Sequence, residues 1–295
     1  MNATCTLGLG TAQWGLHYGL ANQAGVTPAA VVTEILAEAA RAGVVILDTA
    51  SLYGQAESVL GTHSLGAFRI VSKTPKFGAS HITDEHAYRL MQAFDESLYR
   101  LSSSRIYGLL AHHADDLLAP GGGKLIAAML ELREKGKVEK IGVSVYTGAQ
   151  VDDILQIFRP DIVQLPLSIL DQRMLLNGQL ERLKARGIEV HTRSVFLQGL
   201  LLLPLSKVPA YFDPIRPILT RWHAAAAEQG MTAVQAALSF VRHTPYVDTV
   251  LVGVETKAQF QSCLRDFNSP THFDAKNLGC SDQRFVNPMF WNNPQ

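Results

Sequence analysis

Short apolar runs alternate with amphipathic stretches along most of this 295-residue chain. The apolar runs are rich in Val, Ile and Leu, which is typical of strands buried on both faces of a sheet. The amphipathic stretches repeat apolar residues every three or four positions, as helices do. The predicted strands begin at residue 7 and then cover 44–47, 68–72, 106–111, 140–143, 161–165, 188–192 and 249–252. The predicted helices cover 28–41, 57–61, 83–101, 124–135, 151–158, 175–186, 216–229, 233–243 and 256–264.

The boundaries of these elements have local signals. In the first predicted helix, Thr27 is a suitable N-cap, Pro28 fits the first turn, and Gly43 follows the end. Two stretches lack periodicity and are predicted to be irregular, residues 196–214 and the tail 266–295, which is rich in Asn, Pro, Asp and Phe.

Strand and helix alternate eight times with short connections, which predicts an all-parallel sheet. Eight such units in one chain of this size fit a closed (β/α)8 TIM barrel, which typically takes about 250 residues, better than an open sheet split into two domains. No linker or shift in composition divides the chain. We therefore predict an α/β fold with one barrel domain over residues 1–295 and the tail 266–295 packed at the barrel.

Composition excludes several classes of function. Hydrophobic residues make up 47% and charged residues 18%, and the formal net charge is zero, so nothing favours binding to nucleic acid or to a membrane surface. No signal peptide and no apolar run of the roughly 20 residues that span a bilayer is recognised. The three cysteines are far apart and lack CxxC spacing, which indicates reduced thiols and a cytoplasmic protein.

Reactive side chains follow several of the predicted strands. Asp48 follows the second strand with Tyr53 a few residues later, Lys73 follows the third, and His112 and His113 follow the fourth. The later strands end at Ser144, Gln164, Arg193 and Ser194. Each residue alone fits an ordinary turn or a solvated loop charge, but the carboxyl ends of barrel strands converge on one mouth. The sequence therefore predicts an active site there.

These residue types suit the reduction of a carbonyl group. A tyrosine, with a pKa near about 10, holds a proton that it can donate, and a nearby lysine makes it a better acid. An aspartate beside the lysine would keep the lysine charged and in place, and a histidine would orient the substrate oxygen. No HxH, HExxH or Cys/His cluster indicates a metal site, and we expect the adjacent His112 and His113 to point to opposite sides of a strand. The spacing of Gly8 and Gly10 lacks the third glycine and the following helix of a dinucleotide fingerprint.

The chain resembles the aldo-keto reductase family over about residues 5 to 265. The resemblance rests on residues 9–15 (LGTAQWG), 47–54 (LDTASLYG), 71–74 (VSKT), 109–113 (LLAHH), 141–144 (IGVS), 163–165 (VQL) and 250–254 (VLVGV), which occur in the family's order. It implies a catalytic tetrad of Asp48, Tyr53, Lys73 and His112. It also implies a cofactor, NADP(H) and less often NAD(H), lying across the barrel mouth.

The resemblance also implies cofactor-binding residues. Ser144 and Gln164 would hold the nicotinamide carboxamide, and Gly10 and Thr11 would approach its ribose. Arg193, beside Ser194, stands where relatives commonly stack an aromatic ring, so it would lie on the nicotinamide or reach the pyrophosphate. The segment of Gly253, Lys257 and Gln259 stands where many relatives surround the adenosine 2′-phosphate with cations. Here Glu255 and Gln259 replace such cations, which weakens the expectation of a strict NADP(H) preference.

We expect the substrate to meet Trp14, His17, Tyr18 and His113, with Leu52 and the tail aromatics Phe285, Phe290 and Trp291 as further candidates. Trp291 is expected to pack against the barrel wall. Residues 9–20 also resemble a bacterial subgroup associated with carbohydrate pathways, which suggests a sugar-like carbonyl substrate.

The first hypothesis is thus an NAD(P)(H)-dependent oxidoreductase that acts on a small carbonyl compound, with Tyr53 as proton donor. The alternative is a cofactor-sensing or regulatory barrel with little turnover. A third hypothesis is a lyase or isomerase that forms a Schiff base on Lys73. The sequence leaves the oligomeric state open.

Overall fold

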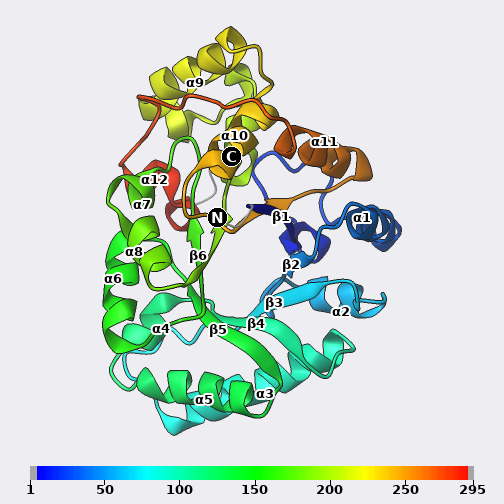
Figure 1. Ribbon diagram of the computed structural model, residues 1–295, viewed down its shortest axis with the longest axis vertical. Coiled ribbons are helices and arrows are strands. Elements are labelled where there is room, and N and C mark those ends of the chain that lie inside the picture. The colour runs from blue at the N-terminus through cyan, green and yellow to red at the C-terminus, as the bar shows by residue number, and fades with distance from the viewer. Residues whose placement is uncertain (1–4, 292–295) are drawn as a thin grey trace.

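Eight parallel strands close into a barrel in the computed structural model, which describes residues 5–291 (Figure 1). The strands are β1 (Thr6–Gly10), β2 (Ile46–Asp48), β3 (Arg69–Lys73), β4 (Ile106–Ala111), β5 (Val138–Ser144), β6 (Ile162–Pro166), β7 (Glu189–Arg193) and β8 (Thr249–Gly253). The barrel closes where β8 pairs with β1, from Thr6 opposite Thr249 to Gly10 opposite Gly253. The predicted single-domain (β/α)8 barrel is confirmed.

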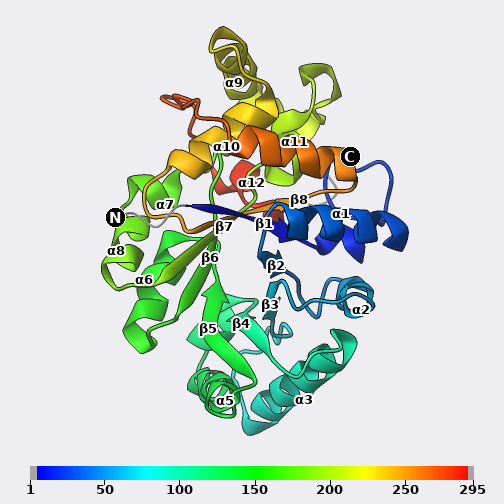
Figure 2. The same cartoon turned by 45° about the vertical axis from the view of Figure 1, so that its right-hand side comes forward.

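Helices surround the sheet on its outer side in both views (Figures 1 and 2). The α-helices are α1 (Ala29–Arg41), α2 (Ala56–Gly61), α3 (Asp84–Arg100), α4 (Ala114–Leu118), α5 (Gly123–Glu134), α6 (Gly148–Ile157), α7 (Arg173–Leu176), α8 (Gln179–Ala185), α9 (Arg216–Glu228), α10 (Ala233–His243), α11 (Lys257–Phe267) and α12 (Gln283–Val286). Five 3₁₀ helices complete the described residues: η1 (Ala12–Trp14), η2 (Leu197–Leu202), η3 (Leu205–Lys207), η4 (Ala210–Ile215) and η5 (Pro288–Phe290). None of the helices in residues 5–291 is both long and apolar enough to cross a membrane.

Helix α3 illustrates how the sequence produces these elements. It begins after Thr83, whose side chain forms a capping box with His86, and its first turn carries two acidic residues that suit the helix dipole. Leu90, Phe94 and Leu98 fall on one face and are buried. Burying each such side chain stabilises the fold by roughly 1.5–3 kcal/mol, so this face holds the helix against the sheet.

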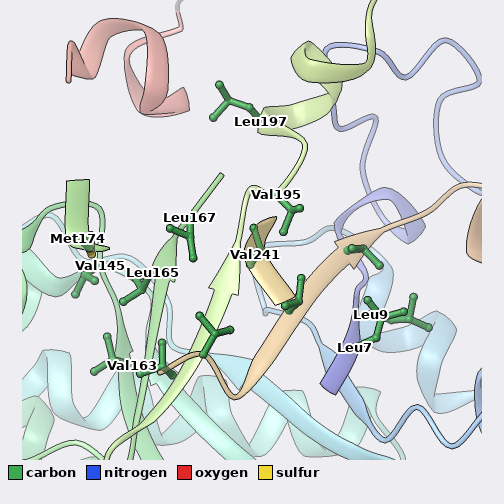
Figure 3. Packing of buried hydrophobic residues seen from close by; sticks show 14 of the residues in the cluster. Leu7, Leu9, Val145, Val163, Leu165, Leu167, Met174, Val195, Leu197 and Val241 are labelled. Atoms are coloured by element: carbon green, nitrogen blue, oxygen red, sulfur yellow. The ribbon is translucent and has the colours of Figure 1, made fainter. Parts of the chain in front are cut away.

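The apolar core has an outer and an inner layer. The outer layer packs the strands against the helices and includes Leu7 and Leu9 of β1 and Val163 and Leu165 of β6 (Figure 3). The inner layer lies inside the barrel and consists of Ile46, Val71, Tyr107, Leu110, Ile162 and Leu251. Gly8 leaves room for it, because a Cβ there would lie 2.9 Å from a methyl group of Leu251. The interior is therefore filled by side chains, and chemistry in such barrels takes place at the carboxyl ends of the strands.

Some predicted elements differ in detail. The predicted helix 175–186 is two helices, α7 and α8, because Gly178 adopts a left-handed conformation between them. The predicted irregular stretch 196–214 contains η2, η3 and most of η4, and the predicted irregular tail contains α12 and η5. The tail lies against the barrel: the N–H of Cys280 donates to the carbonyl of Leu170 at 2.7 Å. Trp291 packs edge-on against Phe212 of η4, with the ring centroids 4.9 Å apart.

Candidate active site

A buried ion pair lies at the carboxyl ends of β2 and β3. Asp48 and Lys73 are the last residues of these two strands, and Lys73 Nζ donates to Asp48 Oδ2 at 2.7 Å. The side chain of Lys73 is only 1% exposed, and its Nζ also donates to the Thr49 carbonyl at 2.9 Å. Burial lowers the pKa of Lys73, and the Asp48 carboxylate opposes this shift. A buried charge needs such partners, because an unpaired ion in a protein interior costs several kcal/mol.

The turn after β2 brings Tyr53 to this pair. The N–H of Tyr53 donates to the Ala50 carbonyl at 3.0 Å, and Gly54 follows in the left-handed conformation that glycine adopts easily. The hydroxyl of Tyr53 lies 3.4 Å from Lys73 Nζ. Burial raises the pKa of Tyr53, the charge of Asp48 raises it further, and the cation of Arg193 lowers it. Tyr53 therefore keeps its proton at neutral pH.

His112 faces Tyr53 from the end of β4. The two rings meet edge to face with their centroids 5.8 Å apart. Nδ1 of His112 is buried and has no hydrogen-bond partner among the described residues. Burial, together with the positive charges of Lys73, Arg193 and Lys76 and the neighbouring His113, lowers the pKa of His112 to about 2. The imidazole is therefore neutral at physiological pH and available for hydrogen bonding.

Gln164, on β6, and Ser144, at the end of β5, are both buried. Gln164 Nε2 donates to Asp48 Oδ1 at 2.7 Å, while its Oε1 has no partner among the described residues. Ser144 ends β5, next to Gln164 in the register between β5 and β6.

Arg193, at the end of β7, stacks on a residue that the sequence analysis did not single out. Its guanidinium lies over the ring of Tyr146 at 4.0 Å and donates to the Val145 carbonyl at 3.0 Å. Tyr146 comes two residues after Ser144, at the end of a predicted strand. An aromatic residue in that position is the sequence signal that could have marked Tyr146 as part of the site.

A cavity of about 330 Å³ opens beside Asp48 and Tyr53. Several predicted cofactor-binding residues line it: Gly10, Thr11, Arg193, Ser194, Gly253 and Gln259. Lys257, Ser144 and Gln164 do not line it. Glu255 also lines the cavity, as do Phe196 and Gln198 from the aperiodic stretch, where no sequence signal marked them. Gln198 has a positive φ of 55°, a conformation often found at functional sites.

The cavity has features that suit a dinucleotide. Thr11, at the cavity wall, has a buried Oγ1 without a partner among the described residues, and a ligand could satisfy this atom. Gly10 and Gly253 expose backbone at the cavity wall, where a ligand can approach closely. The residues present thus fit a polar ligand that approaches the backbone closely beside Tyr53.

Two expectations about this region need correction, those for Trp14 and for the directions of His112 and His113, while the substrate role of His17 stays a prediction. Trp14 is fully buried instead of lining the mouth, because η1 turns its ring inward and its Nε1 donates to the Val254 carbonyl at 3.2 Å. His17 does not line the cavity, and its Nε2 hydrogen-bonds with the Asn22 carbonyl oxygen at 3.0 Å. His112 and His113 do not point to opposite sides, because both lie beyond the end of β4, and their rings lie 5.2 Å apart.

The other predicted substrate contacts differ in whether they line the cavity. Tyr18 lines the cavity, whereas Leu52 is exposed outside it. Phe285 is buried, and Phe290 is half exposed on the tail, and neither lines the cavity. Within residues 5–291, no three His, Cys, Asp or Glu side chains are arranged to hold a metal ion.

Comparison with known proteins gives a consistent family match. The sequence model of the Aldo/keto reductase family matches residues 6–278. No curated protein matches the sequence. An aldo-keto reductase from Bacillus halodurans, solved in its holo form, superposes with a TM-score of 0.74 at 19% identity and covers 100% of this chain and 98% of its own. The glycerol dehydrogenase from Gluconobacter oxydans gives a TM-score of 0.69 at 18% identity and covers 96% of this chain and 92% of its own.

Proposed function

This chain belongs to the aldo/keto reductase family, and from that premise we propose that it reduces an aldehyde or ketone to an alcohol with a nicotinamide cofactor and with Tyr53 as proton donor. Membership supports an oxidoreductase that acts on small carbonyl compounds. The observation that carries the finer proposal is the cluster of Tyr53, Lys73, Asp48 and His112 at one end of the barrel.

Tyr53 and His112 are the two candidates for the proton donor. His112 has a pKa of about 2, so at neutral pH its imidazole is uncharged and carries a single N–H. It therefore has no acidic proton to donate. Tyr53 is protonated at neutral pH, and its hydroxyl lies within reach of Lys73 Nζ. We therefore assign proton donation to Tyr53 and orientation of the carbonyl oxygen to neutral His112. A bound nicotinamide would supply the hydride.

Lys73 and Asp48 support this proton donor. The ammonium of Lys73 stabilises the phenolate that remains after transfer, and Asp48 holds the ammonium in place. The same contacts argue against a Schiff base on Lys73. An attacking amine must be neutral and free to reach a carbonyl carbon, whereas Lys73 Nζ is buried among three oxygen acceptors.

The cavity charges bear on which cofactor the protein prefers. Among the described residues that line the cavity, Arg193 is the only positively charged side chain. Tyr53 and Asp48 line the same cavity. Glu255, which also lines the cavity, would repel a 2′-phosphate and accept a hydrogen bond from a ribose hydroxyl. The resemblance alone favours NADP(H), but these charges favour NAD(H), so we propose that the protein uses NAD(H) at least as well.

Two side chains near the site can hydrogen-bond hydroxyl groups. Tyr18 lines the cavity, and His113, whose pKa burial lowers, lies outside the lining with its ring 5.2 Å from that of His112. These groups support a hydroxylated, sugar-like carbonyl compound. One structural neighbour with a similar fold is named a glycerol dehydrogenase. Polyols and their carbonyl products are therefore the first substrates to test.

One experiment tests the proposal and the cofactor preference together. NADH and NADPH are titrated separately against protein fluorescence, and turnover is then followed by cofactor absorbance over a panel of hydroxylated aldehydes and ketones. We expect binding of both cofactors and turnover of at least one substrate. Glu255→Lys should shift the ratio of affinities toward NADPH by about tenfold or more, because it replaces a repulsive charge by an attractive one. Glu255→Gln is the neutral control. Tight cofactor binding without turnover of any carbonyl would instead favour the cofactor-sensing alternative.

A further inference from the structure

Arg193 carries a positive charge into the cavity without a carboxylate to balance it. It ends β7 and lines the cavity together with Tyr53 and Tyr18. In the part of the chain that the structure describes, its guanidinium donates to the Val145 carbonyl at 3.0 Å and to the more distant Ser194 hydroxyl at 3.4 Å, and to no carboxylate. A guanidinium has five N–H groups, so most of these donors stay free for a ligand.

The guanidinium is held in place by its neighbours. It lies over the ring of Tyr146 at 4.0 Å. The carbonyl of Tyr146 accepts from Arg173 at 3.2 Å, and Arg173 in turn donates twice to Asp171, at 2.7 and 2.8 Å. A donor that is already fixed loses little entropy on binding, and a planar guanidinium can bind a carboxylate or a phosphate through two parallel hydrogen bonds.

The carboxylates that line the cavity are engaged elsewhere. Among the described lining residues these are Asp48 and Glu255. Asp48 pairs with Lys73 at 2.7 Å, and Glu255 lies at the end of β8, where His17 acts on its charge. The positive charge of Arg193 is therefore available to a bound anion.

The neighbours of Arg193 also place it at the reacting end of the cavity. Burial is the main influence on the pKa of Tyr53 and of His112, and the charge of Arg193 lowers the pKa of both. In a nicotinamide dinucleotide, a ribose separates the pyrophosphate from the ring that carries the hydride. A cation beside the proton donor is thus closer to the substrate than to the pyrophosphate.

We propose that Arg193 binds an anionic group of the substrate, so that the protein acts on carbonyl compounds that also carry a carboxylate or a phosphate. This inference rests on the proposed function and narrows its substrate class. A hydroxylated, sugar-like carbonyl compound with such a group is a sugar acid or a sugar phosphate. Arg193 is then the residue that determines specificity, while Tyr53 and His112 act on the carbonyl oxygen.

Two substitutions of Arg193 separate its charge from its shape. Arg193→Met has an unbranched side chain of similar length but loses the charge and every donor. Arg193→Lys keeps the charge but loses the planar fork that binds two oxygens at once. The matched control is Lys76→Met. Lys76 is exposed in the loop after β3 and does not line the cavity, but its charge also lowers the pKa of His112.

The experiment compares charged substrates with neutral counterparts of similar shape. The probes are 4-oxobutanoate against its methyl ester, and glyceraldehyde 3-phosphate against glyceraldehyde. The quantity is the ratio of kcat/KM within each pair, because an effect of the variant on Tyr53 or on the cofactor cancels in this ratio. Cofactor Kd is measured by fluorescence alongside, and thermal unfolding checks that each variant folds.

We expect the parent protein to prefer the anionic member of at least one pair by about tenfold or more, the effect of a charge-assisted hydrogen bond. The pair that shows the preference identifies the anion as carboxylate or phosphate. Arg193→Met should abolish the preference, and Arg193→Lys should retain part of it. Lys76→Met should change the ratio by less than about threefold, because exposed charges interact weakly.

Three results would overturn the proposal. One is a parent protein without preference for the anion in either pair. Another is an Arg193→Met protein with a raised cofactor Kd and an unchanged ratio, which would assign the guanidinium to the cofactor. The third is an equal loss of preference in Lys76→Met, which would point to the general positive potential.

A parent protein that turns over no carbonyl compound would refute the proposed function instead. The role of Arg193 would then be decided by calorimetry, with 4-hydroxybutanoate and glycerol 3-phosphate titrated into the parent and the Arg193→Met protein, with and without NADH. Binding of either anion that is lost in Arg193→Met would support the anion site, and equal binding or no binding would refute it.

Discussion

Replacing Asp48 by Asn tests the buried ion pair on which the site depends. Asp48 accepts from two donors, Lys73 Nζ and Gln164 Nε2, both at 2.7 Å. Asparagine has one oxygen and one NH₂ group, so its side chain can accept from only one of these two donors. Its NH₂ group, itself a donor, then faces the other donor. The remaining acceptors of the ammonium are the Thr49 carbonyl and the more distant Tyr53 hydroxyl.

The expected cost of Asp48→Asn is about 3–5 kcal/mol of unfolding free energy, the range found when one partner of a buried pair is removed. At roughly 2–4 °C per kcal/mol for larger domains, the Tm should fall by about 6 °C or more. The matched control is Asp152→Asn, which breaks an ion pair with Arg182 whose side chains are 45% and 46% exposed and which should cost less than about 1 kcal/mol.

The pH dependence of this loss gives a second check. Without Asp48, the main influence that opposes the lowering of the Lys73 pKa by burial is lost. The unfolded chain then binds a proton that the folded chain holds poorly, so stability rises with pH toward the ordinary pKa of lysine. Calorimetry or denaturant unfolding should therefore show the deficit of Asp48→Asn shrinking from pH 7 to pH 10. An unchanged Tm, or a deficit independent of pH, would refute this account of the pair.

Three further predictions concern the surroundings of the pair. His112→Ala should lower kcat/KM at least tenfold. The shape of the pH profile between pH 5 and pH 9 should stay unchanged, because a residue with a pKa of about 2 does not titrate in that range. A limb near pH 6.5 that is present in the parent protein and vanishes in the variant would contradict this prediction. Arg193→Met removes a cation that lowers the pKa of Tyr53, so the alkaline limb of kcat should move to higher pH, and a shift to lower pH would count against it. Glu57→Gln should destabilise the fold by about 2–4 kcal/mol in denaturant unfolding, because buried Glu57 accepts from both Arg100 and Ser72; a loss under 1 kcal/mol would show that the pair is dispensable.

The fold and the strand-end residues could be predicted because both depend on local pattern. Eight alternations of apolar runs and amphipathic stretches determine the barrel, and a residue directly after a buried strand must lie at its mouth. Asp48, Lys73 and the pair His112 and His113 were predicted on that basis, and the choice of His112 came from the family resemblance. The structure brings Asp48, Lys73 and His112 together with Tyr53.

Features that depend on side-chain direction or on contacts across the barrel could not be predicted. Trp14 is close in sequence to the mouth, but one turn of 3₁₀ helix directs its ring into the core. The bond between Gln164 and Asp48 joins residues 116 positions apart, and no periodicity encodes it. The stacking of Arg193 on Tyr146 likewise requires the strand exits of β5 and β7 to be placed in space.

The central claim is that Tyr53 donates the proton in a cofactor-dependent reduction, and Tyr53→Phe tests it most directly. The substitution removes only the hydroxyl that lies 3.4 Å from Lys73 Nζ. We expect the variant to bind cofactor with a Kd within about twofold of the parent value, because the hydroxyl is assigned to proton transfer alone. Its kcat with the best carbonyl substrate should fall by about 10²–10⁴-fold, the usual contribution of a general acid. Turnover of that substrate at the parent rate, with cofactor binding intact, would contradict the account.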